Sequence, residues 1–133
     1  MEEEIIVVDT DVIIDFTRQT SDELIKYFKS QLSGKLKLVV SLITTFEYYS
    51  GDFLEFEDKK EESDLLFFQF YKQPVTEEIA KLASSINRSN NLYGKIGLGD
   101  LLIGATSIYL GGKLLTNNKK HFRMIPKLKF AGI

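Results

Sequence analysis

Near its start the chain carries the stretch Glu4-Ile5-Ile6-Val7-Val8-Asp9-Thr10-Asp11. Four consecutive β-branched residues, Ile5 to Val8, are typical of a strand that is buried on both faces, as in a parallel sheet covered by helices. The strand is expected to end at a carboxylate, Asp9. Ligands of open α/β sheets bind at the carboxyl ends of the strands, so Asp9 is the first candidate for a functional residue.

Two further acidic residues occupy comparable positions in the sequence. Glu47 follows the apolar stretch Leu38 to Ile43, and Asp100 directly precedes the apolar stretch Leu101 to Leu110. If the three carboxylates converge at one edge of a sheet, they form a site for a hard divalent cation, because such ions prefer oxygen ligands.

The whole chain alternates between strand-like and helix-like segments. Strands are expected at residues 4–9, 36–43, 113–116 and 127–130, with a short extended piece at 73–75. Helices are expected at residues 12–16, 22–31, 76–86 and 101–109, with another starting near Thr45 and either continuing through the charged segment 52–64 or giving way there to a connection. This alternation predicts an α/β fold, in which a mainly parallel central sheet is flanked by helices, within a single domain of residues 1–133.

Composition and net charge exclude several classes of protein. The chain is 44% hydrophobic and 27% charged, with a net charge of -2, which argues against disorder, and it lacks cysteine, which excludes disulfides and thiolate metal sites. Its acidic start and short first apolar run argue against a signal peptide or a membrane span, so a cytoplasmic protein without a membrane partner is expected.

Charge is distributed unevenly along the sequence. Sixteen of the nineteen acidic residues lie within residues 1–64, whereas no acidic residue follows Asp100. The C-terminal part is basic, with Lys113, Lys119, Lys120, Arg123, Lys127 and Lys129. This basic segment either holds a polyanionic substrate beside the acidic site or is a solvated surface that balances the acidic half.

Each acidic candidate also has a purely structural explanation. Thr44 and Glu47 match a capping box, Asp100 fits an N-cap or a first-turn acid, and Asp9 and Asp11 fit turn residues at a strand end. If these explanations hold, the protein is a non-catalytic module that binds RNA or protein. A phosphatase of the haloacid-dehalogenase type, with Asp9 as nucleophile and Asp11 as acid/base, is a further alternative, although it leaves Glu47 without a role.

Four segments in order resemble one known family: Val8 to Asp15, Ser41 to Gly51, Gly99 to Thr106 and Leu114 to Phe122. Together they resemble the PIN-domain ribonucleases, and most closely the VapC-type toxins of toxin–antitoxin pairs. The resemblance implies a PIN-like three-layer α/β/α fold. It also implies a metal-dependent endoribonuclease that hydrolyses phosphodiester bonds in structured RNA such as tRNA or rRNA, pairs with a cognate antitoxin and forms a homodimer.

The resemblance also assigns roles to particular residues. Asp9, Glu47 and Asp100 would be the ligands of Mg²⁺ or Mn²⁺. The resemblance also implies that Thr10, Thr116 and Asn118 support the site. On this reading, the RNA backbone would be contacted by Lys119, Lys120 and Arg123.

The chain departs from the usual family pattern at two positions. Asp11 stands where asparagine is common, which adds negative charge to the site. His121 stands where many relatives carry a fourth aspartate before phenylalanine. It either assists substrate binding or proton transfer, or packs beside Phe122 and caps a turn, and its presence counts against a tightly bound second metal ion.

Overall fold

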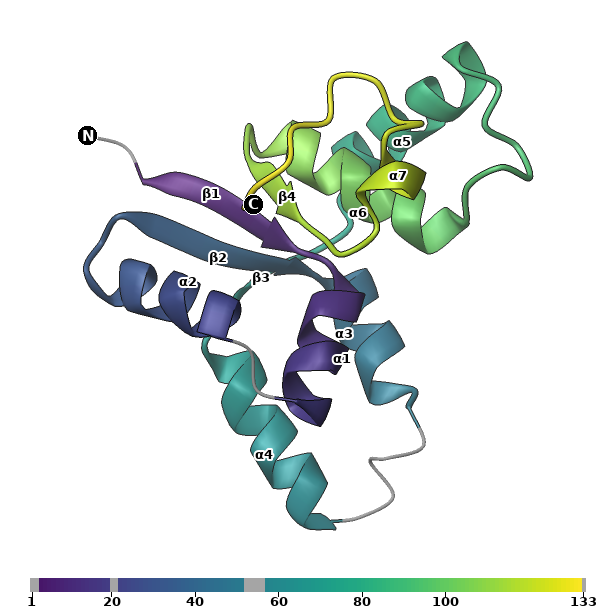
Figure 1. The fold of residues 1–133 in the computed structure, drawn as a ribbon. Helices are drawn as coiled ribbons and strands as arrows, with labels where there is room; N and C mark the ends of the chain where they lie inside the picture. Colours follow the sequence, from purple (N-terminus) through teal and green to yellow (C-terminus); the bar gives the residue numbers. More distant parts are fainter. Residues whose placement is uncertain (1–2, 20–21, 52–56, 133) are drawn as a thin grey trace.

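The computed structural model describes residues 3–19, 22–51 and 57–132. Four strands form one sheet in the order β3-β2-β1-β4, and all neighbouring strands are parallel. The strands are β1 (Glu4–Val8), β2 (Leu36–Ser41), β3 (Tyr71–Gln73) and β4 (Lys113–Leu115). In this register Val8 pairs with Leu115, so the segments that follow β1 and β4 leave the sheet at the same edge (Figure 1).

Helices cover both faces of this sheet. One face packs against α1 (Thr10–Arg18), α2 (Asp22–Leu32) and α4 (Glu57–Phe68), and the other against α5 (Glu77–Ser89), α6 (Leu98–Tyr109) and α7 (Lys119–Phe122). A further helix, α3 (Leu42–Tyr49), follows β2 and contacts α1 and α6.

The strand β1 supplies side chains to both halves of the core. Ile6 and Val8 lie in one buried cluster, whereas Val7 lies in the other, as the alternation of side chains along a strand requires. The predicted α/β/α layering with a parallel sheet is therefore confirmed. In the part of the chain that is described, no helix combines the length and apolarity needed to cross a membrane.

The predicted boundary between the second strand and the following helix was wrong. β2 ends at Ser41 rather than Ile43, and α3 begins at Leu42 rather than near Thr45. The side chain of Ser41 accepts a hydrogen bond from the Ile43 N–H at 3.1 Å and caps the helix. Thr44 is therefore inside the helix, and the predicted capping box between Thr44 and Glu47 does not form.

Other element boundaries also moved. The predicted strand at 127–130 is a single bridge between Leu114 and Phe130, preceded by Lys127 with a positive φ of 68°. The helix around Asp100 begins at Leu98 with Gly97 as N-cap, so Asp100 is a first-turn acid. The predicted N-cap Thr76 is confirmed by its acceptance of the Ile79 N–H. Residues 52–56 of the charged segment lie outside the described residues.

Candidate active site

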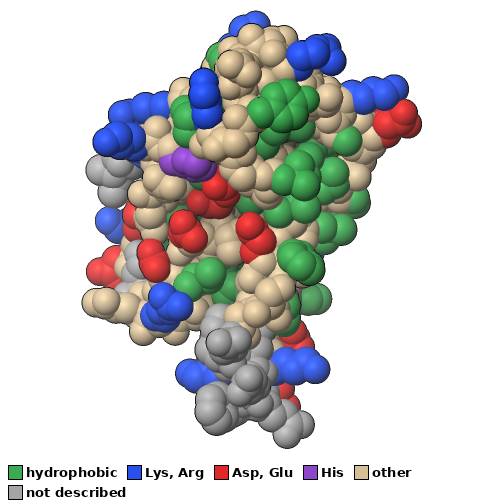
Figure 2. Space-filling model, turned by 90° about the vertical axis from the view of Figure 1, so that its right-hand side faces the viewer, with side chains coloured by type: hydrophobic (Ala, Val, Ile, Leu, Met, Phe, Trp, Pro, Cys, Tyr) green, Lys and Arg blue, Asp and Glu red, His purple; other side chains and the backbone are tan. Residues whose placement is uncertain are grey.

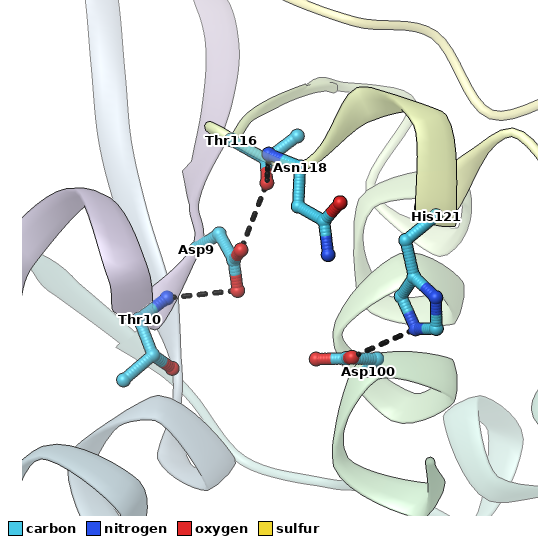
Figure 3. Close-up of polar contacts among 6 residues, drawn as sticks. All are labelled: Asp9, Thr10, Asp100, Thr116, Asn118 and His121. Atoms are coloured by element: carbon cyan, nitrogen blue, oxygen red, sulfur yellow. Dashed lines mark hydrogen bonds and ion pairs between the residues drawn. The ribbon is translucent and has the colours of Figure 1, made fainter. Parts of the chain in front are cut away.

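Asp9 lies at the end of β1 and is the N-cap of α1, with only 3% of its surface exposed. Both carboxylate oxygens accept hydrogen bonds at 2.8 Å, Oδ1 from the Thr10 backbone N–H and Oδ2 from the Thr116 hydroxyl (Figure 3). Burial raises the pKa of Asp9 to about 6, which the Thr116 donor partly opposes. The negative charges of Asp11 and Asp100 raise the pKa of Asp9 further.

Asp100 lies in the first turn of α6, across a gap from Asp9 (Figure 3). The pKa of Asp11 is also raised, first by burial and then by the charges of Asp100 and Asp15. Figure 2 shows acidic side chains gathered on one face of the molecule beneath the single histidine, with basic side chains beyond it. The negative charges of Asp11 and Asp100 therefore act on the buried carboxylate of Asp9.

Glu47 reaches the same edge of the sheet from α3. Its Oε1 accepts the Thr10 hydroxyl at 2.7 Å, and Thr10 Oγ1 also lies 3.0 Å from Thr44 Oγ1. The backbone of Gly99 comes so close that a Cβ there would lie 2.9 Å from Glu47 Oε2. The structure thus joins Thr10 and Glu47 by a direct hydrogen bond. The supporting positions of Thr44 and Gly99 were missed, because Thr44 was interpreted as an N-cap and Gly99 carries no side-chain signal.

The loop after β4 closes over Asp9 from the other side. Thr116 Oγ1 accepts the Asn118 backbone N–H at 3.0 Å, and the side-chain amide of Asn118 points into the space between Asp9 and Asp100 (Figure 3). The neighbouring Asn117 donates from Nδ2 to Asp15 Oδ2 at 2.8 Å, a contact that sequence reasoning did not find. Thr116 and Asn118 therefore reach the site, and the loop is tied to α1.

The short helix α7 places basic groups next to these acids. His121 Nε2 lies 3.1 Å from Asp100 Oδ2, while its ring also contacts Phe122 edge-on. Lys119 is half-buried on the same helix, and Lys120 and Arg123 are exposed. The sequence left two roles open for His121, one in substrate binding or proton transfer and one in packing beside Phe122. The structure shows the packing against Phe122 and, in addition, a polar contact with Asp100.

The donor chemistry of this cleft fits a hard divalent cation. Among the residues described, no three His, Cys, Asp or Glu side chains are close enough to form a complete ligand set. The carboxylates of Asp9 and Asp100 repel one another, however, and this repulsion is part of what raises the pKa of Asp9. A divalent cation with oxygen preference would relieve that repulsion and keep Asp9 ionised.

The fold and this cleft place the chain in a family. A family model of the PIN domain matches residues 6–128, and the chain therefore belongs to the PIN-domain family. Among individual proteins, the chain is similar to Ribonuclease VapC10 of Mycobacterium tuberculosis, with 34% identity over 125 residues that span 93% of this chain and 90% of the relative.

Solved structures share the fold over nearly the full length. VapBC2 from Rickettsia felis, bound to a DNA fragment from its promoter, matches with a TM-score of 0.82 and 21% identity over 96% of this chain and 97% of that one. VapBC-1 from nontypeable Haemophilus influenzae matches with a TM-score of 0.75 and 27% identity over 96% of both chains.

Proposed function

We propose that this protein is a Mg²⁺- or Mn²⁺-dependent endoribonuclease that cuts structured RNA such as tRNA or rRNA in the cytoplasm, and that it is the toxin of a toxin–antitoxin pair. Membership of the PIN-domain family and the similarity to a VapC ribonuclease support an endoribonuclease. The single observation that carries the metal-dependent mechanism is the buried Asp9 carboxylate facing Asp100, with a pKa raised to about 6.

In this proposal Asp9, Glu47 and Asp100 would hold the cation, and because such ions keep several of their waters, the three carboxylates would not all need to touch it directly. When bound, it supplies Lewis-acid stabilisation of phosphoryl charge and activates water for attack on the phosphodiester. Thr116 and the Thr10 N–H orient the Asp9 carboxylate by donating to its two oxygens. The Thr10 hydroxyl does the same for Glu47.

Other residues of the chain would contact the RNA substrate. The Asn118 amide points into the space beside Asp9 and can donate to a phosphate oxygen. Lys119, Lys120 and Arg123 lie on or beside α7 and neutralise the RNA backbone. Asp11 adds negative charge next to the site and so strengthens the electrostatic attraction of the site for a cation.

A cognate antitoxin and a second copy of the chain are the proposed protein partners. One solved structure of similar fold is described as a toxin–antitoxin complex, from Klebsiella pneumoniae. A groove of about 700 Å³ between α1, α3 and α4 is lined by Ile14, Phe16, Glu47 and Leu66, so an antitoxin segment lying in it would reach a ligand of the proposed cation. Phe46 on α3 and Leu98 on α6 are 72% and 73% exposed, which supports a further protein contact.

The test is cleavage of total cellular RNA by the purified protein with Mg²⁺ or Mn²⁺, alongside EDTA and Asp100→Asn controls. Fragments that require the metal and disappear in both controls are the expected result. A melting curve in saturating Mn²⁺ is recorded in parallel, because a ligand that binds the folded state raises the melting temperature. No cleavage together with no Mn²⁺-dependent stabilisation would favour the non-catalytic binding module instead.

The phosphatase alternative is not favoured. The PIN-domain match spans residues 6–128 and includes Glu47, which has no role in an aspartyl-phosphate mechanism. The two oxygens of Asp9 are also both engaged by donors, which orients them as ligands rather than freeing one as a nucleophile.

A further inference from the structure

His121 is the side chain that contacts Asp100 most directly. Its Nε2 lies 3.1 Å from Asp100 Oδ2, within hydrogen-bonding distance, and the two side chains are only 27% and 34% exposed. The two groups form an ion pair when the imidazole is protonated. The imidazole of α7 and the carboxylate of α6 therefore meet at one defined pair of atoms.

The imidazole is itself held in place by the fold. His121 lies on α7 directly before Phe122, whose side chain is 1% exposed and belongs to the core cluster between the sheet and α6. The two rings meet edge-on with their centroids 5.8 Å apart. The position of Nε2 is thus fixed by a buried anchor one residue away.

Asp100 has little else to fix its carboxylate. Within residues 3–19, 22–51 and 57–132 no side chain donates a hydrogen bond to the Asp100 carboxylate, and His121 is its ion-pair partner. Figure 3 shows one Asp100 oxygen engaged by His121 and the other turned toward the side of Asp9. Without the imidazole, the carboxylate would be free to rotate about its side-chain bonds.

We propose that His121 is a positioning residue, which engages one oxygen of Asp100 and thereby presents the other toward Asp9 for the cation of the proposed function. This inference rests on that function and adds a residue that acts through Asp100 rather than on the substrate. Groups that orient a ligand from outside the metal's own coordination shell commonly change metal affinity by about 10–100-fold when removed.

The contact can be tested first without any metal. The chain contains one histidine, so an imidazole ¹⁵N spectrum has a single, unambiguous set of signals. Asp100→Asn should shift the Nε2 signal of His121, whereas the distant Asp22→Asn control on α2 should leave it in place. An Nε2 signal that Asp100→Asn does not move would overturn the proposal.

The consequence for the cation is tested by Mn²⁺ titration, followed by calorimetry and by electron paramagnetic resonance of free Mn²⁺. His121→Ala should weaken Mn²⁺ binding by about 10-fold or more. His121→Gln, whose amide nitrogen stands close to the place of Nε2, should restore affinity to within about 3-fold of the parent protein. A purely structural role for His121 predicts no such rescue, and all variants are first checked for an unchanged melting temperature.

The outcomes separate this inference from the proposed function. If the parent protein binds Mn²⁺ and His121→Ala binds it equally tightly, or if His121→Gln fails to restore affinity, the positioning role is wrong and the proposed function stands. If the parent protein binds no Mn²⁺, the proposed function fails, and the positioning of Asp100 for a cation fails with it.

Discussion

Thr116 and Asp9 are 107 positions apart in the sequence, yet the Thr116 hydroxyl donates a 2.8 Å hydrogen bond to Asp9 Oδ2 inside the protein. The same hydroxyl oxygen accepts the Asn118 backbone N–H at 3.0 Å. One side chain therefore links the catalytic candidate at the end of β1 to the loop after β4, and it opposes the effect of burial on the pKa of Asp9.

Thr116→Val tests this link because it keeps the shape of the side chain and removes both hydrogen bonds. We expect the free energy of unfolding to fall by about 1–3 kcal/mol, since the Asn118 N–H and the Asp9 carboxylate each lose a partner. The pKa of Asp9 should rise above about 6, so the acidic limb of the profile of RNA cleavage against pH should move to higher pH. Thr116→Ser keeps the hydroxyl and serves as the control; equal behaviour of the two variants would contradict the proposed link.

Asp9→Asn should stabilise the metal-free protein while it abolishes RNA cleavage. The folded-state pKa of Asp9 is about 6, above its ordinary value of 3.8, so the folded state binds the proton more tightly than the unfolded state. The stability due to that proton is complete below about pH 4 and is lost as the pH rises through about 6. Removing the charge should therefore raise the free energy of unfolding at pH 7.5 by on the order of 1–3 kcal/mol.

Urea unfolding of Asp9→Asn and of the parent protein between pH 4 and 8 checks this prediction. The parent should lose stability across that range by more than the variant does, and Mn²⁺ should stabilise the parent alone. Asp22→Asn, at an exposed position in the first turn of α2, is the matched control and should follow the parent curve. If Asp9→Asn unfolds the protein, the capping role of Asp9 outweighs its electrostatic cost, and the structural explanation of this residue gains support.

Gly99→Ala should reduce cleavage without loss of stability. A Cβ at residue 99 would lie 2.9 Å from Glu47 Oε2 and 3.4 Å from Ile43 Cγ2, so the flexible end of Glu47 must move. In a helix, alanine is more favourable than glycine by up to about 1 kcal/mol, so the substitution should also stabilise the first turn of α6. We expect cleavage to fall by roughly 10-fold or more, on the basis that small misplacements at a reacting centre are costly, with an unchanged or higher melting temperature.

The control for this variant is Gly97→Ser. Residue 97 has open space around its Cβ direction and serine is a good N-cap, so activity should match that of the parent protein. A Gly99→Ala protein with full activity would show that Glu47 does not need its present position.

The first strand and its carboxylate could be predicted because their signal is local. Ile5 to Val8 form a continuous β-branched run, and the strand they form ends immediately before Asp9. The boundary of α3 could not be predicted in the same way. Ile43, Thr44 and Thr45 are β-branched and favour a strand, but the Ser41 side chain caps a helix that begins before them and packing keeps it helical.

Contacts between residues that are far apart in the sequence could not be predicted from the sequence pattern. The positions of Asp9, Glu47 and Asp100 at strand-to-helix transitions predicted a common edge, yet the pairing of Glu47 with Thr10 depends on how α3 packs against α1. The contact of His121 with Asp100 likewise depends on the placement of α7 over α6. A sequence shows which residue types follow each strand, whereas side-chain distances of about 3 Å arise only after the helices have packed.

The basic residues around α7 give the last prediction. If Lys120 and Arg123 neutralise RNA phosphates, removing both should weaken RNA binding and lower the slope of log affinity against log salt concentration by about 0.7–0.9 for each lost phosphate contact. Binding is measured in an Asp9→Asn background, so that the RNA remains intact. Lys26→Ala, which removes an exposed charge from α2 on the opposite side of the sheet, should leave the slope unchanged. A double variant with the parent slope would locate the RNA on another surface, whereas a reduced slope together with unchanged melting would assign the basic segment to the substrate rather than to solvation.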